Sequence, residues 1–241
     1  MRHVSKTSIV KAVEDAVNYA RTMRRAAAVT GAPGIGKSTA LQSISDADPS
    51  AILIYVGGAR RTDRAFARLL ADSIGIVTGA ESTAKLWDIA ESILSHPQFG
   101  NILLFDEAQN IPLALLKEVV DFPSRFGVPV VVCGNAELLK RQRVASAAFD
   151  QVSSRIAKRV VLNAPTPEDF QTIGVDFDVF GKDAHAACVD FGLNTSIREL
   201  VQVLESARVY AGDGPLRLQE IKRAVAWIKG AHALKLLSRA A

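Results

Sequence analysis

The stretch from Gly31 to Thr39, GAPGIGKST, constrains the fold of this chain more than any other segment. It matches the pattern GxxxxGK[ST] in full, and it lies between the apolar run 25–30 and a segment with helix-forming residues. Glycines let the backbone curl so that its amides point at phosphates, and the positive end of the following helix favours their negative charge. The pattern therefore predicts a strand, a phosphate-binding loop and a helix that bind a nucleoside triphosphate.

The chemistry of this loop assigns roles to its last residues. Lys37 is expected to reach the β- and γ-phosphates, and the Ser38 hydroxyl is expected to be a ligand of Mg²⁺. The predicted cofactors are therefore ATP and Mg²⁺. The residues expected to contact the nucleotide are Gly31, Ala32, Pro33, Gly34, Ile35, Gly36, Lys37, Ser38 and Thr39.

A second motif, which is acidic, follows about seventy residues later, in the stretch NILLFDE at 101–107. An apolar run that ends in two carboxylates is typical of a buried parallel strand whose carboxyl end carries acids to the phosphate site. Asp106 is expected to hold Mg²⁺ through its water shell, and Glu107 to orient and polarise the attacking water. The motif therefore predicts a nucleotide hydrolase.

The rest of the chain alternates between helical and strand patterns. Strands separated by helices indicate a parallel sheet with right-handed crossovers and a ligand at the carboxyl ends of the strands. The expected strands cover residues 26–29, 51–56, 101–106, 128–133 and 159–162. The expected helices include 5–23, 63–74, 83–94 and 113–121, with a short helix after the phosphate loop.

The pattern changes near residue 165, and only helical segments are expected beyond it. Thr166 can cap a helix that begins with Pro167 and carries Glu168 and Asp169 in its first turn. We therefore expect an α/β nucleotide-binding domain over 1–165, with a short N-terminal helix, and a small all-helical domain over 166–241.

Three further polar residues lie where an oligomeric ATPase needs them. Asn135 directly follows the fourth strand, so its side chain can reach the γ-phosphate or the attacking water. Arg155 lies shortly before the fifth strand, which suits an arginine presented to the nucleotide of a neighbouring subunit. Arg198 begins a helix of the appended domain and can close over the phosphates from there.

Together these motifs resemble those of an AAA+ ATPase. In that family, 31–38 and 102–107 correspond to the Walker A and Walker B motifs, Asn135 and Arg198 to sensors 1 and 2, and Arg155 to the arginine finger. The resemblance implies a five-stranded parallel P-loop NTPase sheet flanked by helices, followed by a helical lid domain.

Within that superfamily, the short chain, the DEAQ form of the acidic motif, the YVGGARR stretch at 55–61 and the compact lid resemble the transposition target-selection ATPases. This group contains the phage Mu B protein, TnsC and TniB. The resemblance implies a ring or helical filament of identical subunits on duplex DNA, sequence-tolerant binding and recruitment of a DDE transposase. The Mu B protein has a helix-turn-helix domain before its ATPase, whereas only about 25 residues precede the first strand here.

Basic residues gather in two segments of a chain with a net charge of +4. Arg60, Arg61 and Arg64 follow the second strand and are the expected DNA contacts, because arginines against successive phosphates bind DNA without reading its sequence. The basic segment 215–241 is the alternative location, and a solvated helix face is the alternative explanation of either cluster.

Two other functions share these ATPase residues. A helicase loader similar to IstB or DnaC would load a ring helicase instead of capturing a transposase. A nucleotide-gated interaction switch would bind ATP, hydrolyse it negligibly and not contact DNA. A helicase of the DEAD type requires two tandem motor domains, which 241 residues cannot hold.

Composition indicates a cytoplasmic protein without a membrane segment. No apolar run approaches 18 residues, and the amino terminus has no signal-peptide pattern. Cys133 and Cys188 lie in apolar segments, as expected for buried free thiols in a reducing compartment.

Overall fold

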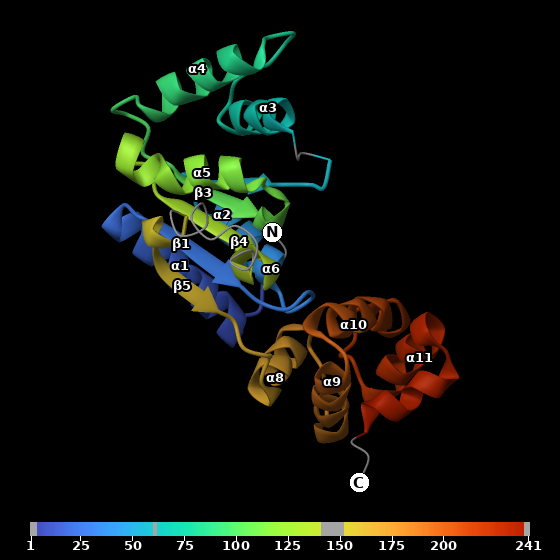
Figure 1. Cartoon of the computed structure of the whole chain (residues 1–241). Helices are drawn as coiled ribbons and strands as arrows, with labels where there is room; N and C mark the ends of the chain where they lie inside the picture. Colours follow the sequence, from blue (N-terminus) through green and yellow to red (C-terminus); the bar gives the residue numbers. More distant parts are fainter. Residues whose placement is uncertain (1–3, 60–61, 141–151, 239–241) are drawn as a thin grey trace. The chain divides into compact units, whose positions relative to one another are not determined.

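The computed structural model describes residues 4–59, 62–140 and 152–238 (Figure 1). Contacts between residues group the chain into two compact units. The larger unit comprises 12–32 and 37–162, and the smaller one comprises 1–11, 33–36 and 163–241. The sequence predicts two domains with a boundary near residue 165. This division into domains stays a prediction.

The larger unit is built on five parallel strands in the order β2-β3-β4-β1-β5 (Figure 1). The three central strands are buried along their whole length, which explains why they contain almost only apolar residues. The predicted five-stranded parallel sheet is thus confirmed. The strands are β1 (Ala26–Thr30), β2 (Ala51–Tyr55), β3 (Ile102–Asp106), β4 (Val130–Gly134) and β5 (Ile156–Val161).

The register of the sheet brings three strand ends to the same edge. Thr30 at the end of β1 pairs with Gly134 at the end of β4, and Phe105 of β3 pairs with Val132 of β4. Strand β4 therefore lies between the strand that precedes the glycine-rich loop and the strand that ends in Asp106.

Helices pack on this sheet in the larger unit. Helix α5 contacts β1 and β4, α2 and α3 contact β2, and α3 packs on α4. Side-chain caps fix two starts: Thr62 accepts from the Ala65 amide before α3, and Ser82 from the Lys85 amide before α4. The helices are α1 (Ser8–Met23), which begins in the smaller unit, α2 (Lys37–Ala47), α3 (Asp63–Ser73), α4 (Thr83–Leu94), η1 (Ala108–Asn110), α5 (Leu113–Phe126) and α6 (Glu137–Lys140).

The main core of the larger unit lies between the sheet and helices α3, α4 and α5. Phe105 of β3 stacks on Phe66 of α3 with 6.1 Å between ring centroids, and both rings are fully buried. Truncating a buried phenylalanine of this kind to alanine typically costs about 3–5 kcal/mol. Because Phe105 directly precedes Asp106, this packing also fixes the end of β3 that carries the acidic motif.

Two elements extend further than the sequence predicts. The sequence predicts that helix α5 ends near Asp121, but the helix continues through Pro123 to Phe126 and stops at Gly127, whose φ is 70°. Pro123 lacks the amide for an internal helix bond, yet its side chain is buried, so packing offsets the loss. The sequence predicts the fifth strand over 159–162, whereas β5 begins at Ile156. Its first residues are missed because β5 is a half-buried edge strand with alternating burial, and a search for continuous apolar runs does not detect such a pattern.

The smaller unit is helical after residue 163, as predicted. Helix α8 begins with a capping box in which Asp169 accepts from the Thr166 amide at 2.9 Å. The same buried carboxylate accepts from the amide and hydroxyl of Ser8, at 2.6 and 2.7 Å, and thereby caps α1. The helices are α8 (Pro167–Asp176), α9 (Lys182–Asn194), α10 (Ile197–Ala211), α11 (Leu218–Lys229) and η3 (Ala231–Leu237).

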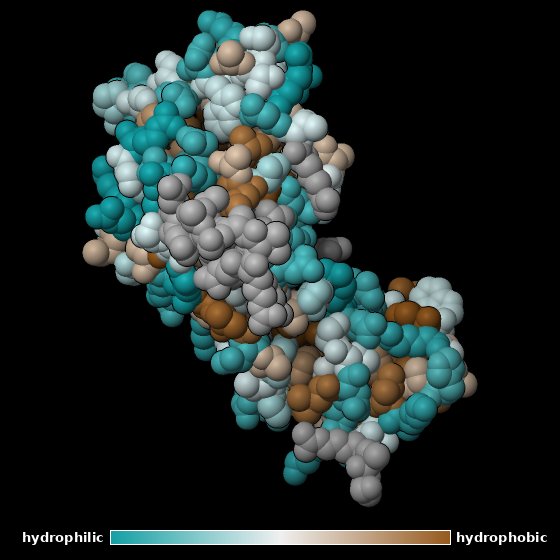
Figure 2. All heavy atoms as spheres, in the orientation of Figure 1, coloured by the Kyte–Doolittle hydropathy of each residue, from teal (hydrophilic) through white to brown (hydrophobic). Residues whose placement is uncertain are grey.

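On the face drawn in Figure 2, hydrophilic residues predominate over α3 and α4. Tyr210 and Trp227 are exposed on α10 and α11 and pack edge to face, with 6.1 Å between ring centroids. Among the helices that the structure describes, none is long and apolar enough to cross a bilayer.

Both cysteines are fully buried free thiols, and we expect them to be unreactive in the folded protein. Burial raises the pKa of Cys133 and of Cys188 to about 12, so very little thiolate forms at pH 8. A thiol-reactive chromophore at pH 8 should label neither cysteine in the native protein and both in denaturant. Native labelling as fast as labelling of the unfolded chain would contradict this burial.

Candidate nucleotide site

The glycine-rich loop connects β1 to α2, as the sequence predicts. Gly34 and Gly36 adopt φ values of 79° and 104°, which favour glycine and turn the backbone sharply. Lys37, the first residue of α2, is buried, and its ammonium donates to the carbonyls of Gly31 at 3.0 Å and Ala32 at 2.8 Å. The lysine is thus held over the start of the loop that it is expected to serve.

The acidic motif lies at the end of β3. Asp106 is 3% exposed, and its Oδ1 accepts from the Glu107 amide at 2.9 Å. Glu107 adopts a left-handed backbone conformation with φ of 54° and ψ of 36°. A residue other than glycine rarely adopts this conformation, and such strained positions concentrate at functional sites.

Charges of both motifs act on one buried thiol. The pKa of Cys133, near the end of β4, is raised first by burial and then by the charge of Asp106, while the charge of Lys37 lowers it. Lys37 and Asp106 are therefore brought near the same point of the sheet.

The Ser38 hydroxyl is exposed in the first turn of α2. A hydroxyl and a carboxylate are hard oxygen donors, which suit Mg²⁺.

Asn135 follows β4 directly, where the sequence predicts it. Its side-chain oxygen accepts from the Glu137 amide at 2.9 Å and so caps the short helix α6. Its backbone amide donates to Oε1 of Gln109 at 3.2 Å, and Gln109 in turn donates to the carboxylate of Glu107. A residue to which the sequence assigned no role of its own thus connects Glu107 to Asn135.

Arg155 ends the helical segment 152–155, immediately before β5. Its guanidinium forms an ion pair with Asp121 of α5, with 2.9 Å between Nη1 and Oδ2. The arginine side chain is 36% exposed and the aspartate side chain 17%. The candidate arginine finger therefore has a partner within its own chain, which the sequence did not predict.

Arg198 is exposed in the first turn of α10, which Ser196 caps. Its backbone amide donates to the carbonyl of Gly34 at 3.1 Å. A side chain at Gly34 would meet Ser196 Oγ at 3.4 Å, so the start of α10 lies against this part of the glycine-rich loop. Both segments belong to the smaller unit.

Of the expected DNA contacts, Arg60 and Arg61 lie outside the described residues. Arg64 is exposed in the first turn of α3. Hydrogen bonds from the backbone amides of Glu81 and Gly79 lower the pKa of the Glu81 carboxyl, and the charges of Arg68 and Arg64 add to this effect. An acidic group thus lies within the electrostatic reach of Arg64.

The alternative basic segment at the carboxyl end contains exposed and paired cations. Lys222 and Arg223 are exposed on α11. Lys229 donates to Glu199 at 2.8 Å, and Arg217, which is also exposed, stacks over the ring of Phe180. The segment thus contains exposed cations besides the paired Lys229.

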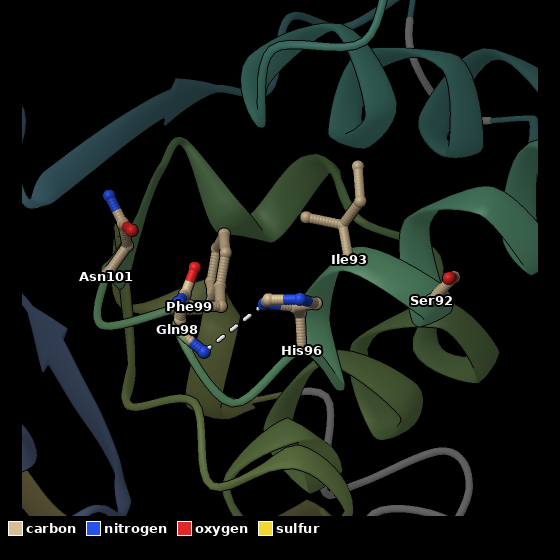
Figure 3. A pocket seen from close by; sticks show the side chains of 6 residues that line it. All are labelled: Ser92, Ile93, His96, Gln98, Phe99 and Asn101. Atoms are coloured by element: carbon tan, nitrogen blue, oxygen red, sulfur yellow. Dashed lines mark hydrogen bonds between the residues drawn. The ribbon is translucent and has the colours of Figure 1, made fainter.

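A hollow of about 320 Å³ lies between the end of α4 and the start of β3 (Figure 3). His96 accepts there from the Gln98 amide at 3.3 Å. Because Asn101 precedes β3, the hollow is at the opposite strand end from Asp106. It is therefore separate from the candidate nucleotide site. Its lining consists of Ser92, Ile93, His96, Gln98, Phe99 and Asn101.

The sheet order and the position of the two motifs define the class. A glycine-rich loop after β1 and an acidic motif after β3, with β4 between these strands, are the arrangement of an AAA+ P-loop NTPase. The model of an AAA domain family matches residues 20–142, slightly more than half of the chain. The chain therefore belongs to the AAA domain family, whose fold supports nucleotide hydrolysis in general.

Several solved structures share this fold. The chain is similar to Cdc6p from Pyrobaculum aerophilum, with 15% identity and a TM-score of 0.65 over 91% of this chain and 66% of that one. It is also similar to the ORC2 protein of Aeropyrum pernix, solved as ADPNP–ADP complexes, with 16% identity and a TM-score of 0.67 over 95% and 70% of the two chains.

Domain III of the replication initiation protein DnaA from Thermotoga maritima is similar over 91% of this chain and 90% of that domain, with 16% identity and a TM-score of 0.59. None of the curated proteins has a significant sequence match. Likeness at this identity shows the fold. The chain spans about two thirds of the length of Cdc6p.

Proposed function

We propose that this protein hydrolyses ATP at the candidate nucleotide site. The single observation that carries the proposal is the adjacency of three strand ends, which supply the glycine-rich loop with Lys37, the buried Asp106 with Glu107, and Asn135. Lys37 would bind the β- and γ-phosphates and Glu107 would orient the attacking water, because phosphoryl transfer requires mainly positioning and charge stabilisation. Ser38 and Asp106 would hold Mg²⁺, which supplies positive charge to the phosphates when bound.

Two residues would complete the site from outside the central strands. Arg198 would act as the sensor residue of the helical unit. The hydrogen bond from its backbone amide to the Gly34 carbonyl supports this role, because it joins the start of α10 to the phosphate loop. Arg155 would reach the nucleotide of a neighbouring subunit and would exchange its partner Asp121 for the γ-phosphate. Hydrolysis would then depend on assembly into a homo-oligomer.

The second part of the proposal is that ATP-bound subunits assemble on duplex DNA as a ring or helical filament. The ORC1 protein of Aeropyrum pernix, solved in complex with DNA, shares this fold at 18% identity and a TM-score of 0.65. A sequence pI near 9.2 and the exposed Arg64 also support DNA as the partner. One subunit has few phosphate contacts, but assembly makes successive contacts effectively intramolecular.

The client of the DNA-bound assembly would be a DDE transposase. The support is the combination of motifs in this chain: the DEAQ acidic motif, the YVGGARR stretch and the compact helical lid that resemble the transposition target-selection ATPases. A helicase loader would have the same ATPase residues, so the two functions differ in the protein that the DNA-bound form captures.

Replacing Arg60, Arg61 and Arg64 together by alanine should weaken ATP-dependent binding to duplex DNA and spare ATP binding. We expect the slope of log affinity against log salt to become shallower by about 1 to 3, because each lost phosphate contact removes roughly 0.9. Filter binding over a salt series, with and without ATP, measures both quantities.

The matched control removes the same charge from the carboxyl-terminal segment by replacing Lys222, Arg223 and Lys235, which are all exposed. It should bind DNA with the wild-type salt slope. The reverse outcome would move the DNA contacts to α11 and η3. If wild-type protein binds no duplex DNA with or without ATP, the DNA part of the proposal is wrong. Negligible hydrolysis of ATP in addition would favour an interaction switch.

A further inference from the structure

Gln109 lies at the centre of a hydrogen-bond relay between the two residues expected to act on the attacking water. It belongs to the 3₁₀ turn η1 (Ala108–Asn110), directly after the acidic motif. Its amide nitrogen donates to Oε2 of Glu107, and its amide oxygen accepts from the backbone amide of Asn135 at 3.2 Å. The Gln109 side chain thus donates to the residue that follows β3 and accepts from the residue that follows β4.

The turn that carries Gln109 is anchored independently of the relay. Asn110 donates to the carbonyl of Val56 at 2.8 Å, and the Val56 amide donates to the carbonyl of Asp106 at 3.0 Å. These bonds join η1 to the end of β2. Because the backbone is held there, the Gln109 side chain extends to Asn135 from a fixed base.

The structure also leaves room for the Gln109 amide at one position of β4. Gly134 has no side chain, and a Cβ there would overlap Oε1 of Gln109 far inside van der Waals contact. The φ of Gly134 is not positive, so alanine could adopt the same backbone. The space beside Gly134 is therefore filled by the glutamine amide, which any larger residue would displace.

We propose that Gln109 is a positioning residue for hydrolysis: it fixes the Glu107 carboxylate by one oxygen, orients the other towards the water, and sets this carboxylate relative to Asn135. The inference rests on the proposed ATPase function. Glu107 alone has a flexible side chain on a strained backbone, and a carboxylate free to rotate is a poor guide for a water molecule. An amide that donates to one oxygen and is itself fixed by a backbone amide removes that freedom.

Gln109→Ala should lower kcat about 10- to 100-fold, the scale of a catalytic group misplaced by an ångström, with little change in KM or in affinity for a slowly hydrolysed ATP analogue. Gly134→Ala should have the same effect, because its Cβ displaces the same amide. Gly100→Ala is the matched control, since a Cβ at Gly100 meets nothing within 4 Å. It should retain the wild-type kcat.

Two double variants distinguish this role from a general loss of structure. Gly134→Ala should cause little further loss when Gln109 is already alanine, because the overlapping oxygen is gone. Gln109→Ala should likewise leave the residual rate of Glu107→Gln unchanged, because it acts through that carboxylate.

The outcomes separate the inference from the function on which it rests. If wild type hydrolyses ATP and Glu107→Gln does not, but Gln109→Ala or Gly134→Ala retains the wild-type kcat, the inference is overturned and the ATPase function stands. Loss of analogue affinity equal to the loss of kcat, or fully additive effects in both double variants, also overturns it. If wild type and Glu107→Gln release phosphate at the same rate, the proposed function fails, and the inference fails with it.

Discussion

Lys37→Ala is expected to abolish ATP binding, whereas Glu107→Gln is expected to preserve binding and stop turnover. The Lys37 ammonium donates to the carbonyls of Gly31 and Ala32 in the glycine-rich loop, so its removal takes away the cation proposed to bind the triphosphate. Glu107 is proposed to act on water instead, and the loss of a general base typically costs about 100- to 10,000-fold in rate. Binding of a fluorescent ATP analogue and release of phosphate measure the two effects separately.

Either variant can refute its own assignment. Hydrolysis at the wild-type rate by the Glu107→Gln protein would remove Glu107 from the catalytic site. Tight analogue binding by the Lys37→Ala protein would show that Lys37 is not required for ATP binding. Gln42→Ala is a suitable control on α2, because this exposed side chain donates to Asp46 of the same helix at 2.7 Å. Both activities should be retained.

Arg155→Ala is expected to slow hydrolysis by roughly a thousandfold or more, the usual scale for an arginine finger, with nucleotide binding largely intact. Asp121→Asn breaks the same ion pair without removing the arginine. It should therefore keep turnover near the wild-type level. Phosphate release under saturating ATP compares the two variants.

A mixing experiment tests whether Arg155 acts between subunits. Arg155→Ala has an intact loop but no finger, and Lys37→Ala has a finger but no working loop. Mixed assemblies should regain part of the activity that both lack alone. The absence of rescue at every mixing ratio, or an equal loss in Asp121→Asn and Arg155→Ala, would indicate that the residue is only part of a structural ion pair.

Most of the fold was predictable because its elements carry strong local signals. The glycine-rich loop defines the end of β1 and the start of α2, and the apolar run before Asp106 defines β3. Thr166 and Pro167 mark the start of α8 through capping chemistry alone. Such signals depend only on residues that are close together in the sequence, so they can be recognised without the structure.

Features that depend on tertiary contacts were not predictable. Nothing near Arg155 in sequence indicates that Asp121, on another element, is its partner. The glutamine in DEAQ is visible, but its bond to the Asn135 amide requires the register of β3 and β4 and the absence of a side chain at Gly134. The continuation of α5 through Pro123 likewise depends on burial against the sheet.

Electron microscopy of the purified protein with duplex DNA tests the central claim most directly. With a slowly hydrolysed ATP analogue, the account predicts rings or continuous filaments of this protein on the DNA, and with ADP it predicts bare DNA. The Lys37→Ala protein should leave the DNA bare in both conditions. Identical coverage with the analogue and with ADP, or no assembly on DNA under either condition, would contradict the account.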